Sequence, residues 1–238
     1  MRLPPIRKQG TLVKRYKRFL ADIELEDDTI LTVHCPNSGS MRGCSEPGSP
    51  VIISHSDNPK RKYAWTLEMV RTEGVWVGVN TARTNTIVRE ALENGIIDEW
   101  GHILSIRPEV RVSEKSRLDF QIDTGDGTVF LEVKNCSLAE DGTALFPDAV
   151  TSRGTRHLQE LAALAGQGHR SAVLFCVQRC DVDRFAPAAD IDPVYSRTLV
   201  RVRQLGVEVL AYRARVEPGE IVLTRGLPVL DGEGSRPG

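Results

Sequence analysis

The chain has 238 residues, and its 31 basic and 32 acidic side chains leave a formal net charge of −1 at pH 7. This length allows one large domain or two modest ones, and the near-neutral charge gives no whole-molecule argument for nucleic-acid binding. No apolar run is long enough to span a membrane, and the first ten residues lack the apolar core of a signal peptide. Five cysteines without zinc-ligand spacing indicate reduced thiols, so we expect a cytoplasmic protein without membrane association.

Positive charge is nevertheless concentrated in two places in the first part of the chain. The first eighteen residues contain seven Lys or Arg side chains and no acid, and a run of three consecutive cations follows further on. Segregated positive charge is what phosphate binding requires. A solvated arm is the alternative, and charge alone does not decide between the two readings. The candidate nucleic-acid contacts are Arg15, Arg18, Lys60, Arg61 and Lys62.

Between residues 10 and 80 the sequence predicts short strands and no convincing helix. The predicted strands cover residues 10–19, 21–26, 29–35, 50–54, 65–72 and 75–79. Turn-rich pieces separate them, which indicates a small closed barrel, and an OB-type barrel is one candidate. Barrels of that type bind single strands with a basic groove and stacking aromatic rings. Tyr16, Phe19, Tyr63 and Trp65 lie near the basic clusters, as stacking platforms or as ordinary core and surface rings.

Beyond residue 80 helical and extended patterns alternate. A helix is predicted from a cap at Thr84 or Asn85 to an end near Gly95, with apolar residues at helical spacing between them. Further strands are predicted at 103–112, 117–123, 128–135, 171–178, 207–212 and 220–224, and further helices at 151–166 and 193–205. This order predicts an α/β sheet with helices on both faces.

The most informative stretch is a predicted hairpin whose turn is centred between Gly125 and Asp126. In that register Asp119 on the first strand lies directly opposite Glu132 on the second. Because side chains alternate along a strand, Lys134 shares the face of Glu132. The same alternation predicts that Leu118, Phe120 and Ile122 share one face, and that Leu131 and Val133 share one face. Two carboxylates and an ammonium therefore converge on one patch of the sheet.

Such a patch has a chemical use. Opposed carboxylates repel each other unless a cation lies between them, and hard oxygen ligands suit Mg²⁺ or Mn²⁺. A lysine beside such a metal can orient or activate a water, or stabilise developing charge. The alternative is an ordinary solvated strand face, and a register slip of one residue would separate the pair.

Residue types suited to anion binding follow in the link to the next helix. Arg153 and His157 are four residues apart and share a helix face, and Thr151 with the first helical amides could receive a phosphate oxygen. Glu90, bordering the apolar stripe of the first helix, is a candidate third carboxylate, and Asp148 is a weaker one. Taken singly, each has an ordinary structural explanation. Taken with the carboxylate pair, they favour phosphate contact.

The chain resembles the sugar fermentation stimulation protein A family of bacteria and archaea over almost its whole length. The matching pieces are residues 35–41 (CPNSGSM), 56–63 (SDNPKRKY), 79–81 (VNT), 116–120 (SRLDF), 132–134 (EVK), 146–154 (FPDAVTSRG) and 157–158 (HL). The resemblance implies an N-terminal OB-like domain, a C-terminal domain similar to PD-(D/E)xK nucleases, DNA binding and a link to sugar-utilisation genes.

In nucleases of that fold the Asp and Glu hold Mg²⁺ and the Lys assists the attacking water. The resemblance therefore assigns these roles to Asp119, Glu132 and Lys134, and the helix acid to Glu90. The sequence departs from the nuclease pattern at Leu118, where a proline usually precedes the first metal-binding Asp.

We therefore expect an OB-like nucleic-acid-binding domain over residues 1–82, a nuclease-like α/β domain over 83–230 and a disordered tail over 231–238. The favoured hypothesis is a DNA-binding, Mg²⁺- or Mn²⁺-dependent nuclease. The alternative is a non-catalytic, non-specific DNA-binding protein that regulates genes of sugar (maltose) metabolism. Strandedness, the choice between DNA and RNA, and the oligomeric state, a homodimer included, stay open.

Overall fold

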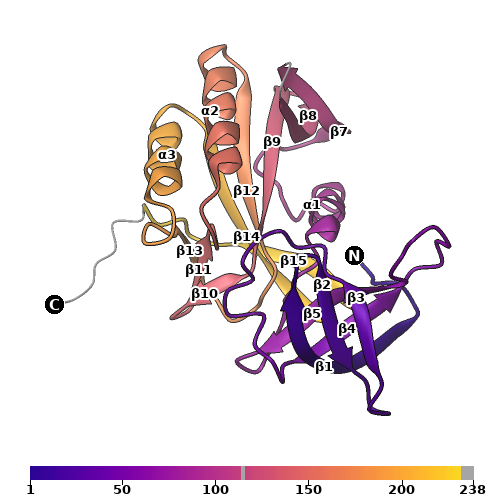
Figure 1. Ribbon diagram of the computed structural model, residues 1–238. Helices are drawn as coiled ribbons and strands as arrows, with labels where there is room; N and C mark the ends of the chain where they lie inside the picture. Colours follow the sequence, from indigo (N-terminus) through magenta and orange to yellow (C-terminus); the bar gives the residue numbers. More distant parts are fainter. Residues whose placement is uncertain (114–115, 232–238) are drawn as a thin grey trace.

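The chain folds into a barrel followed by a larger mixed sheet with helices (Figure 1). The structure is a computed structural model and describes residues 1–113 and 116–231. Nearly all of the tail that we expected to be disordered lies outside the described residues. None of the helices in the described part of the chain is long and apolar enough to cross a membrane.

The N-terminal part forms the predicted barrel. Its strands are β1 (Arg7–Tyr16), β2 (Leu20–Glu24), β3 (Ile30–His34), β4 (Pro50–His55), β5 (Trp65–Thr72) and β6 (Val75–Gly78). They run in the order β3-β2-β1-β4-β5-β6, and a parallel pairing of β3 with β5 at His34 and Thr66 closes the sheet. Large aliphatic side chains such as Leu12, Ile23 and Leu67 fill the interior. The OB-like fold predicted from the sequence is confirmed.

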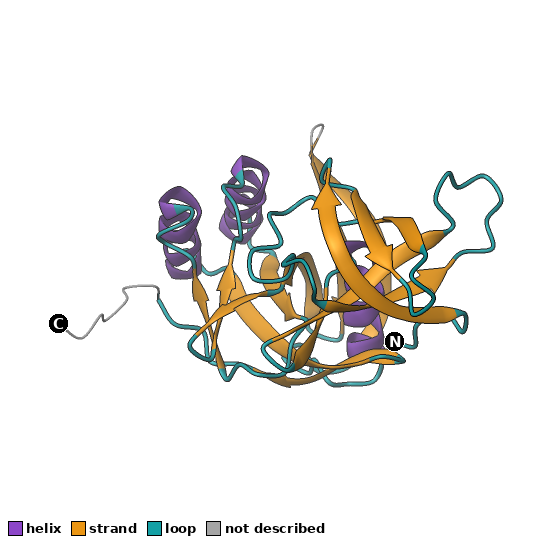
Figure 2. Cartoon of the chain, turned by 60° about the horizontal axis from the view of Figure 1, so that its bottom comes forward, coloured by secondary structure: helices purple, strands orange, loops and turns teal. Residues whose placement is uncertain are grey.

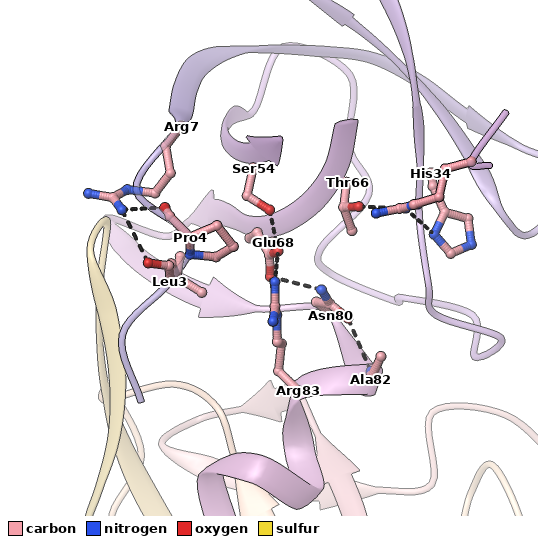
Figure 3. A network of polar contacts seen from close by, with 11 residues as sticks. Leu3, Pro4, Arg7, His34, Ser54, Thr66, Glu68, Asn80, Ala82 and Arg83 are labelled. Atoms are coloured by element: carbon pink, nitrogen blue, oxygen red, sulfur yellow. Dashed lines mark hydrogen bonds and ion pairs between the residues drawn. The ribbon is translucent and has the colours of Figure 1, made fainter. Parts of the chain in front are cut away.

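A buried carboxylate fastens the barrel to the next element (Figure 3). Glu68 on β5 is completely buried and accepts hydrogen bonds from Ser54 at 2.6 Å, Asn80 at 2.8 Å and Arg83 at 3.0 Å. Asn80 also caps the short 3-10 turn η1 (Thr81–Arg83), which leads directly into α1 (Thr84–Glu93). The predicted cap at Thr84 or Asn85 is therefore wrong, because the helix continues a turn that begins earlier.

The C-terminal part is built on a second sheet. Its strands are β7 (Ile103–Ser113), β8 (Ser116–Thr124), β9 (Gly127–Cys136), β12 (Arg170–Val177), β14 (Glu208–Glu217) and β15 (Glu220–Gly226). They run in the order β15-β14-β12-β9-β8-β7, with β12 parallel to both of its neighbours. The sequence missed a small sheet of β10 (Leu138–Glu140), β11 (Thr143–Phe146) and β13 (Arg184–Pro187). These strands are too short to show a periodic pattern.

Helices cover both faces of this sheet, as predicted. The apolar side of α1 packs into one core cluster with Phe120 and Leu131, whereas α2 (Ser152–Gly166) and α3 (Pro193–Gln204) pack into another with Phe175. Figure 2 shows two helices together at one end of the molecule and the third beside the barrel. The carboxylate-bearing strand β9 runs between these two helical layers.

The β8–β9 hairpin has the predicted register from Thr124–Gly127 to Phe120–Leu131, and the regular ladder ends there. Leu118, Phe120 and Ile122 are all buried in strict alternation along β8, as predicted, although Leu118 packs in a different core cluster from the other two. Because β8 leaves the β9 ladder before Asp119, the predicted cross-strand pair of Asp119 and Glu132 is not part of the ladder. The strand separation opens a cleft beside Asp119.

Candidate functional site

A polar cleft of about 570 Å³ opens where β8 separates from β9 and faces α2. Its lining residues are Glu109, Arg111, Ser116, Arg117, Asp119, Glu132, Arg153 and His157. Two of the three predicted metal-binding carboxylates, Asp119 and Glu132, therefore lie in one cleft, together with Glu109 and three arginines. An arginine-rich wall around a carboxylate pair suits a phosphate held against a cation.

Glu132 is the centre of the site. Its side chain is buried, and Oε1 accepts from Nζ of Lys134 at 2.5 Å and contacts Nδ1 of His157. Its other oxygen, Oε2, is buried and has no hydrogen-bond partner among the described residues. A buried carboxylate oxygen without a partner is costly unless a ligand supplies one.

His157 orients Glu132. Arg153 donates from Nε to Nε2 of His157 at 3.4 Å, and because an arginine can only donate, Nε2 is the accepting nitrogen. The proton then lies on Nδ1, which donates to Glu132. We had expected His157 to steady a phosphate. The structure buries His157 and engages both of its ring nitrogens with protein groups, although His157 and Arg153 both line the cleft.

Asp119 lies beside Glu132 and accepts from the backbone N–H of Val133 at 2.7 Å and from Asn85 at 2.8 Å. Burial, followed by the negative charge of Glu132, raises the pKa of Asp119 to about 6. Burial alone would also raise the pKa of Glu132, but the hydrogen bond from His157 and the charge of Lys134 hold it below its ordinary value. The negative charge of Glu132 therefore contributes to the raised pKa of Asp119, while Glu132 itself is held ionised.

This arrangement fits a divalent cation on two counts, the unpartnered Oε2 of Glu132 and the mutual repulsion of the pair. Residues 1–113 and 116–231 contain no cluster of three His, Cys, Asp or Glu side chains with metal-site geometry. The predicted third carboxylate does not join the pair, because Glu90 binds the amino group of Met1 at 2.9 Å. Any remaining ligands would come from water, phosphate or backbone oxygens.

The start of α2 is capped by the protein itself. Thr151 accepts from the N–H of Gly154 at 3.1 Å, as the sequence predicted for an N-cap, and its own N–H donates to Asp192 at 2.8 Å. Both of these groups are therefore occupied rather than open to a phosphate. Asp148 lies outside the carboxylate cleft and accepts from the backbone N–H of Met41 in the barrel at 2.9 Å.

The structure does not bring the predicted basic contacts of the barrel into the cleft. Arg15 is used internally, because its guanidinium donates to the carbonyls of four residues, Arg18, Asn37, Gly39 and Ser40. Arg61 donates to Thr66 at 2.8 Å. The other three, Arg18, Lys60 and Lys62, are exposed on the barrel. Only these exposed cations keep the character expected of a phosphate-binding surface.

Several residues of the site escaped sequence reasoning. Asn85 was read only as a helix cap, yet it contacts Asp119. Arg117 adjoins the predicted motif but had no assigned role, and Ser116 hydrogen-bonds Glu160 on α2 across the cleft. No local pattern reports such contacts, because they join elements far apart in the sequence.

Comparisons with known proteins agree with this architecture. The family model described as the SfsA N-terminal OB domain matches residues 13–79, and the model described as the sugar fermentation stimulation protein RE domain matches residues 82–220. The Pyrococcus furiosus structure described as SfsA in complex with Ca²⁺ superposes with a TM-score of 0.89 at 27% identity. That superposition covers 97% of this chain and 98% of the other.

Sequence relatives are closer still. A sugar fermentation stimulation protein homolog of Geobacter sulfurreducens is 54% identical over 233 residues, covering 98% of this chain and 100% of the relative. A homolog of Desulfotalea psychrophila is 52% identical over 92% of this chain and 90% of the relative. With both domains matched and such identities over nearly the full length, the chain belongs to the sugar fermentation stimulation protein family.

Proposed function

We propose that the chain is a divalent-metal-dependent phosphodiesterase that cuts DNA, with Asp119 and Glu132 as metal ligands. The observation that carries this proposal is the buried, unpartnered Oε2 of Glu132 beside a second carboxylate. A group destined only for stability would have had this oxygen satisfied. The Ca²⁺ in the relative from Pyrococcus furiosus supports the choice of a hard divalent cation, which prefers carboxylate oxygens.

Each residue of the cleft would have its own role in the cleavage reaction. Lys134 and His157 hold Glu132 ionised and fixed in position. Lys134 uses one N–H on Glu132 and has two others with which to orient a water or a phosphate oxygen. Arg117 and Arg153 line the cleft, where they would neutralise phosphate charge. Mg²⁺ or Mn²⁺, when bound, would supply Lewis-acid polarisation of the phosphate and a more acidic water.

DNA is proposed as the substrate on the basis of charge. The cleft lining carries three arginines and three carboxylates, so a bound divalent cation would make the site net positive, which suits a phosphodiester rather than a neutral substrate. The exposed cations of the barrel, Arg18, Lys60 and Lys62, would add sequence-independent attraction for a polyanion.

A non-catalytic DNA-binding regulator is the second candidate. It is favoured by the absence of a third acidic or imidazole ligand at the pair among the described residues. In that case Lys134 would act only as the ion-pair partner of Glu132. The two candidates differ in the effect of added metal: the nuclease would cut DNA, whereas the regulator would bind DNA without cutting it.

Cleavage of end-labelled single- and double-stranded DNA in Mg²⁺ or Mn²⁺ tests the proposal. We expect Asp119→Asn, Glu132→Gln and Lys134→Ala each to lower the cutting rate by about 10²–10³-fold, because the first two each remove an anionic metal ligand and the third removes the cation that would orient a water or phosphate oxygen. Asp126→Asn is the matched control, since Asp126 is an exposed turn carboxylate on the same hairpin. DNA binding without cutting in any metal would refute the nuclease and favour the regulator.

A further inference from the structure

A second cavity, of about 330 Å³, lies between the two domains. The barrel contributes the loop that contains Asn37 and Ser38, and the second domain contributes β9 and the segment before α2, including Lys134, Asn135 and Val150. Neither domain forms this cavity alone. Lys134 connects it to the cleft, because the same side chain lines the cavity and binds Glu132.

The barrel side of the cavity is fixed in place. Ser40 donates from Oγ to the carbonyl of Asp148 at 2.7 Å, and the Met41 N–H donates to the Asp148 carboxylate at 2.9 Å. A Cβ atom at Gly39 would lie 2.7 Å from both Asp148 carboxylate oxygens, so this loop approaches the second domain as closely as a glycine allows. The guanidinium of Arg15 also donates to the loop carbonyls of Asn37 and Gly39. The cavity is therefore preformed.

Asn135 gives the cavity an oriented hydrogen-bond donor. Its Oδ1 accepts from Thr84 at 3.2 Å and from the buried Gln178, which fixes the orientation of the amide. No acceptor for its Nδ2 exists in the described portion of the chain, and Asn135 is only half-buried. Because the Oδ1 of Asn135 is held by Thr84 and Gln178, its Nδ2 is left to donate to a ligand.

We propose that this cavity binds one unpaired nucleobase of the DNA strand whose phosphate lies at the carboxylate pair. Its volume is at the low end for ligand sites, and one positive and one negative side chain, Lys134 and Asp148, leave it without net charge. The apolar side chains of Leu145 and Val150 offer surface to a flat ring, and Asn135 offers a donor to a ring nitrogen or carbonyl. A neutral, partly apolar cavity next to a phosphate site suits a base better than a second phosphate.

This inference rests on the proposed function, yet its test needs no cutting. DNA that carries the fluorescent base 2-aminopurine at successive positions is titrated with the full-length protein in Ca²⁺. We expect a change in fluorescence confined to one or two adjacent positions. Ser38→Trp, which plugs the cavity from the exposed barrel loop, should abolish that change and weaken binding by about tenfold. Asn135→Ala should reduce both effects by less.

Thr224→Trp is the matched control, because Thr224 is exposed on β15 and lines neither cavity. A position-specific signal that Ser38→Trp removes and Thr224→Trp keeps would support the base site, even in a protein that never cuts DNA. No position-specific signal in the wild type, or an equal signal in the plugged variant, would overturn it, even if cutting is intact.

Discussion

Two buried carboxylates, one in each domain, have opposite surroundings. Glu68 in the barrel has donors on both oxygens, from Ser54, Asn80 and Arg83. Glu132 in the second domain has two donors on one oxygen and none on the other, as far as the described residues show. Glu68 lines neither the cleft nor the second cavity and has both oxygens satisfied, so it holds the protein together, whereas Glu132 lines the cleft with that one oxygen unpartnered and is available to a ligand. The comparison therefore indicates a structural role for Glu68 and a ligand-binding role for Glu132.

The largest effect should come from breaking the satisfied carboxylate. Glu68→Ala leaves the partly buried Arg83 without its ion-pair partner and should lower the free energy of unfolding by about 3–5 kcal/mol. Glu132→Gln keeps a hydrogen-bonding group beside Lys134 and removes a buried charge with one unpartnered oxygen, so in metal-free buffer it should lower the free energy of unfolding by less than Glu68→Ala does. Denaturant unfolding of both variants measures the difference. An equal loss of unfolding free energy in both variants would contradict the distinction between the two carboxylates.

A second prediction concerns the residue that orients Glu132. Without the hydrogen bond from His157, the metal-binding carboxylate is less well positioned, so His157→Ala should weaken divalent-cation binding by about 10–100-fold. His102→Ala, at an exposed histidine, is the control. Calorimetric titration gives both affinities, and an unchanged affinity in His157→Ala would show that this histidine is only a packing residue.

A third prediction uses pH. Folding raises the pKa of Asp119 from 3.8 to about 6, so folding favours its protonated form, and the metal-free protein should lose stability as pH rises across that interval. Asp119→Asn removes this loss and should stabilise the metal-free protein by on the order of 1–2 kcal/mol above pH 6. Unfolding measured at pH 4.5 and pH 7.5 in a chelator tests the sign. A variant less stable than wild type at the higher pH would contradict it.

The smallest predicted effect concerns two arginines of the barrel, Arg15, which is used internally, and Arg18, which is exposed. Arg15→Ala removes several hydrogen bonds to loop carbonyls and should cost about 1–2 kcal/mol of stability. Arg18→Ala, at an exposed position, should change stability by less than about 0.5 kcal/mol but weaken DNA binding and its salt dependence. Thermal unfolding and DNA titrations at several salt concentrations separate the two. The reverse result would place Arg15 on the DNA-binding surface.

The elements of both domains were largely predictable from the sequence, because strand periodicity and turn chemistry are local. The turn at Gly125 and Asp126 set the hairpin register correctly. The core cluster that Leu118 joins was not predictable, because it depends on which other elements of the fold pack against that end of β8. The predicted pairing of Glu90 with the site failed for a similar reason, because its partner, the amino group of Met1, comes from the far end of the sequence.

The candidate site was predicted in its residue types but not in its connections. Spacing brought Asp119, Glu132 and Lys134 together, yet it could not show that His157 would bind Glu132 rather than a ligand. Nor could it show that Arg15 would be used to hold the barrel loop. Such assignments depend on tertiary contacts, which a single sequence does not encode in any local pattern.

Calorimetric titration of Mn²⁺ into the wild type, Glu132→Gln and Asp119→Asn decides whether the carboxylate pair binds a divalent cation. We predict one saturable site in the wild type and binding at least about tenfold weaker in each variant, because each loses one anionic ligand. Asp126→Asn, the exposed carboxylate of the same hairpin, should bind like the wild type. Equal binding in all four proteins, or no binding in the wild type, would contradict the claim that the half-satisfied carboxylate is a metal ligand.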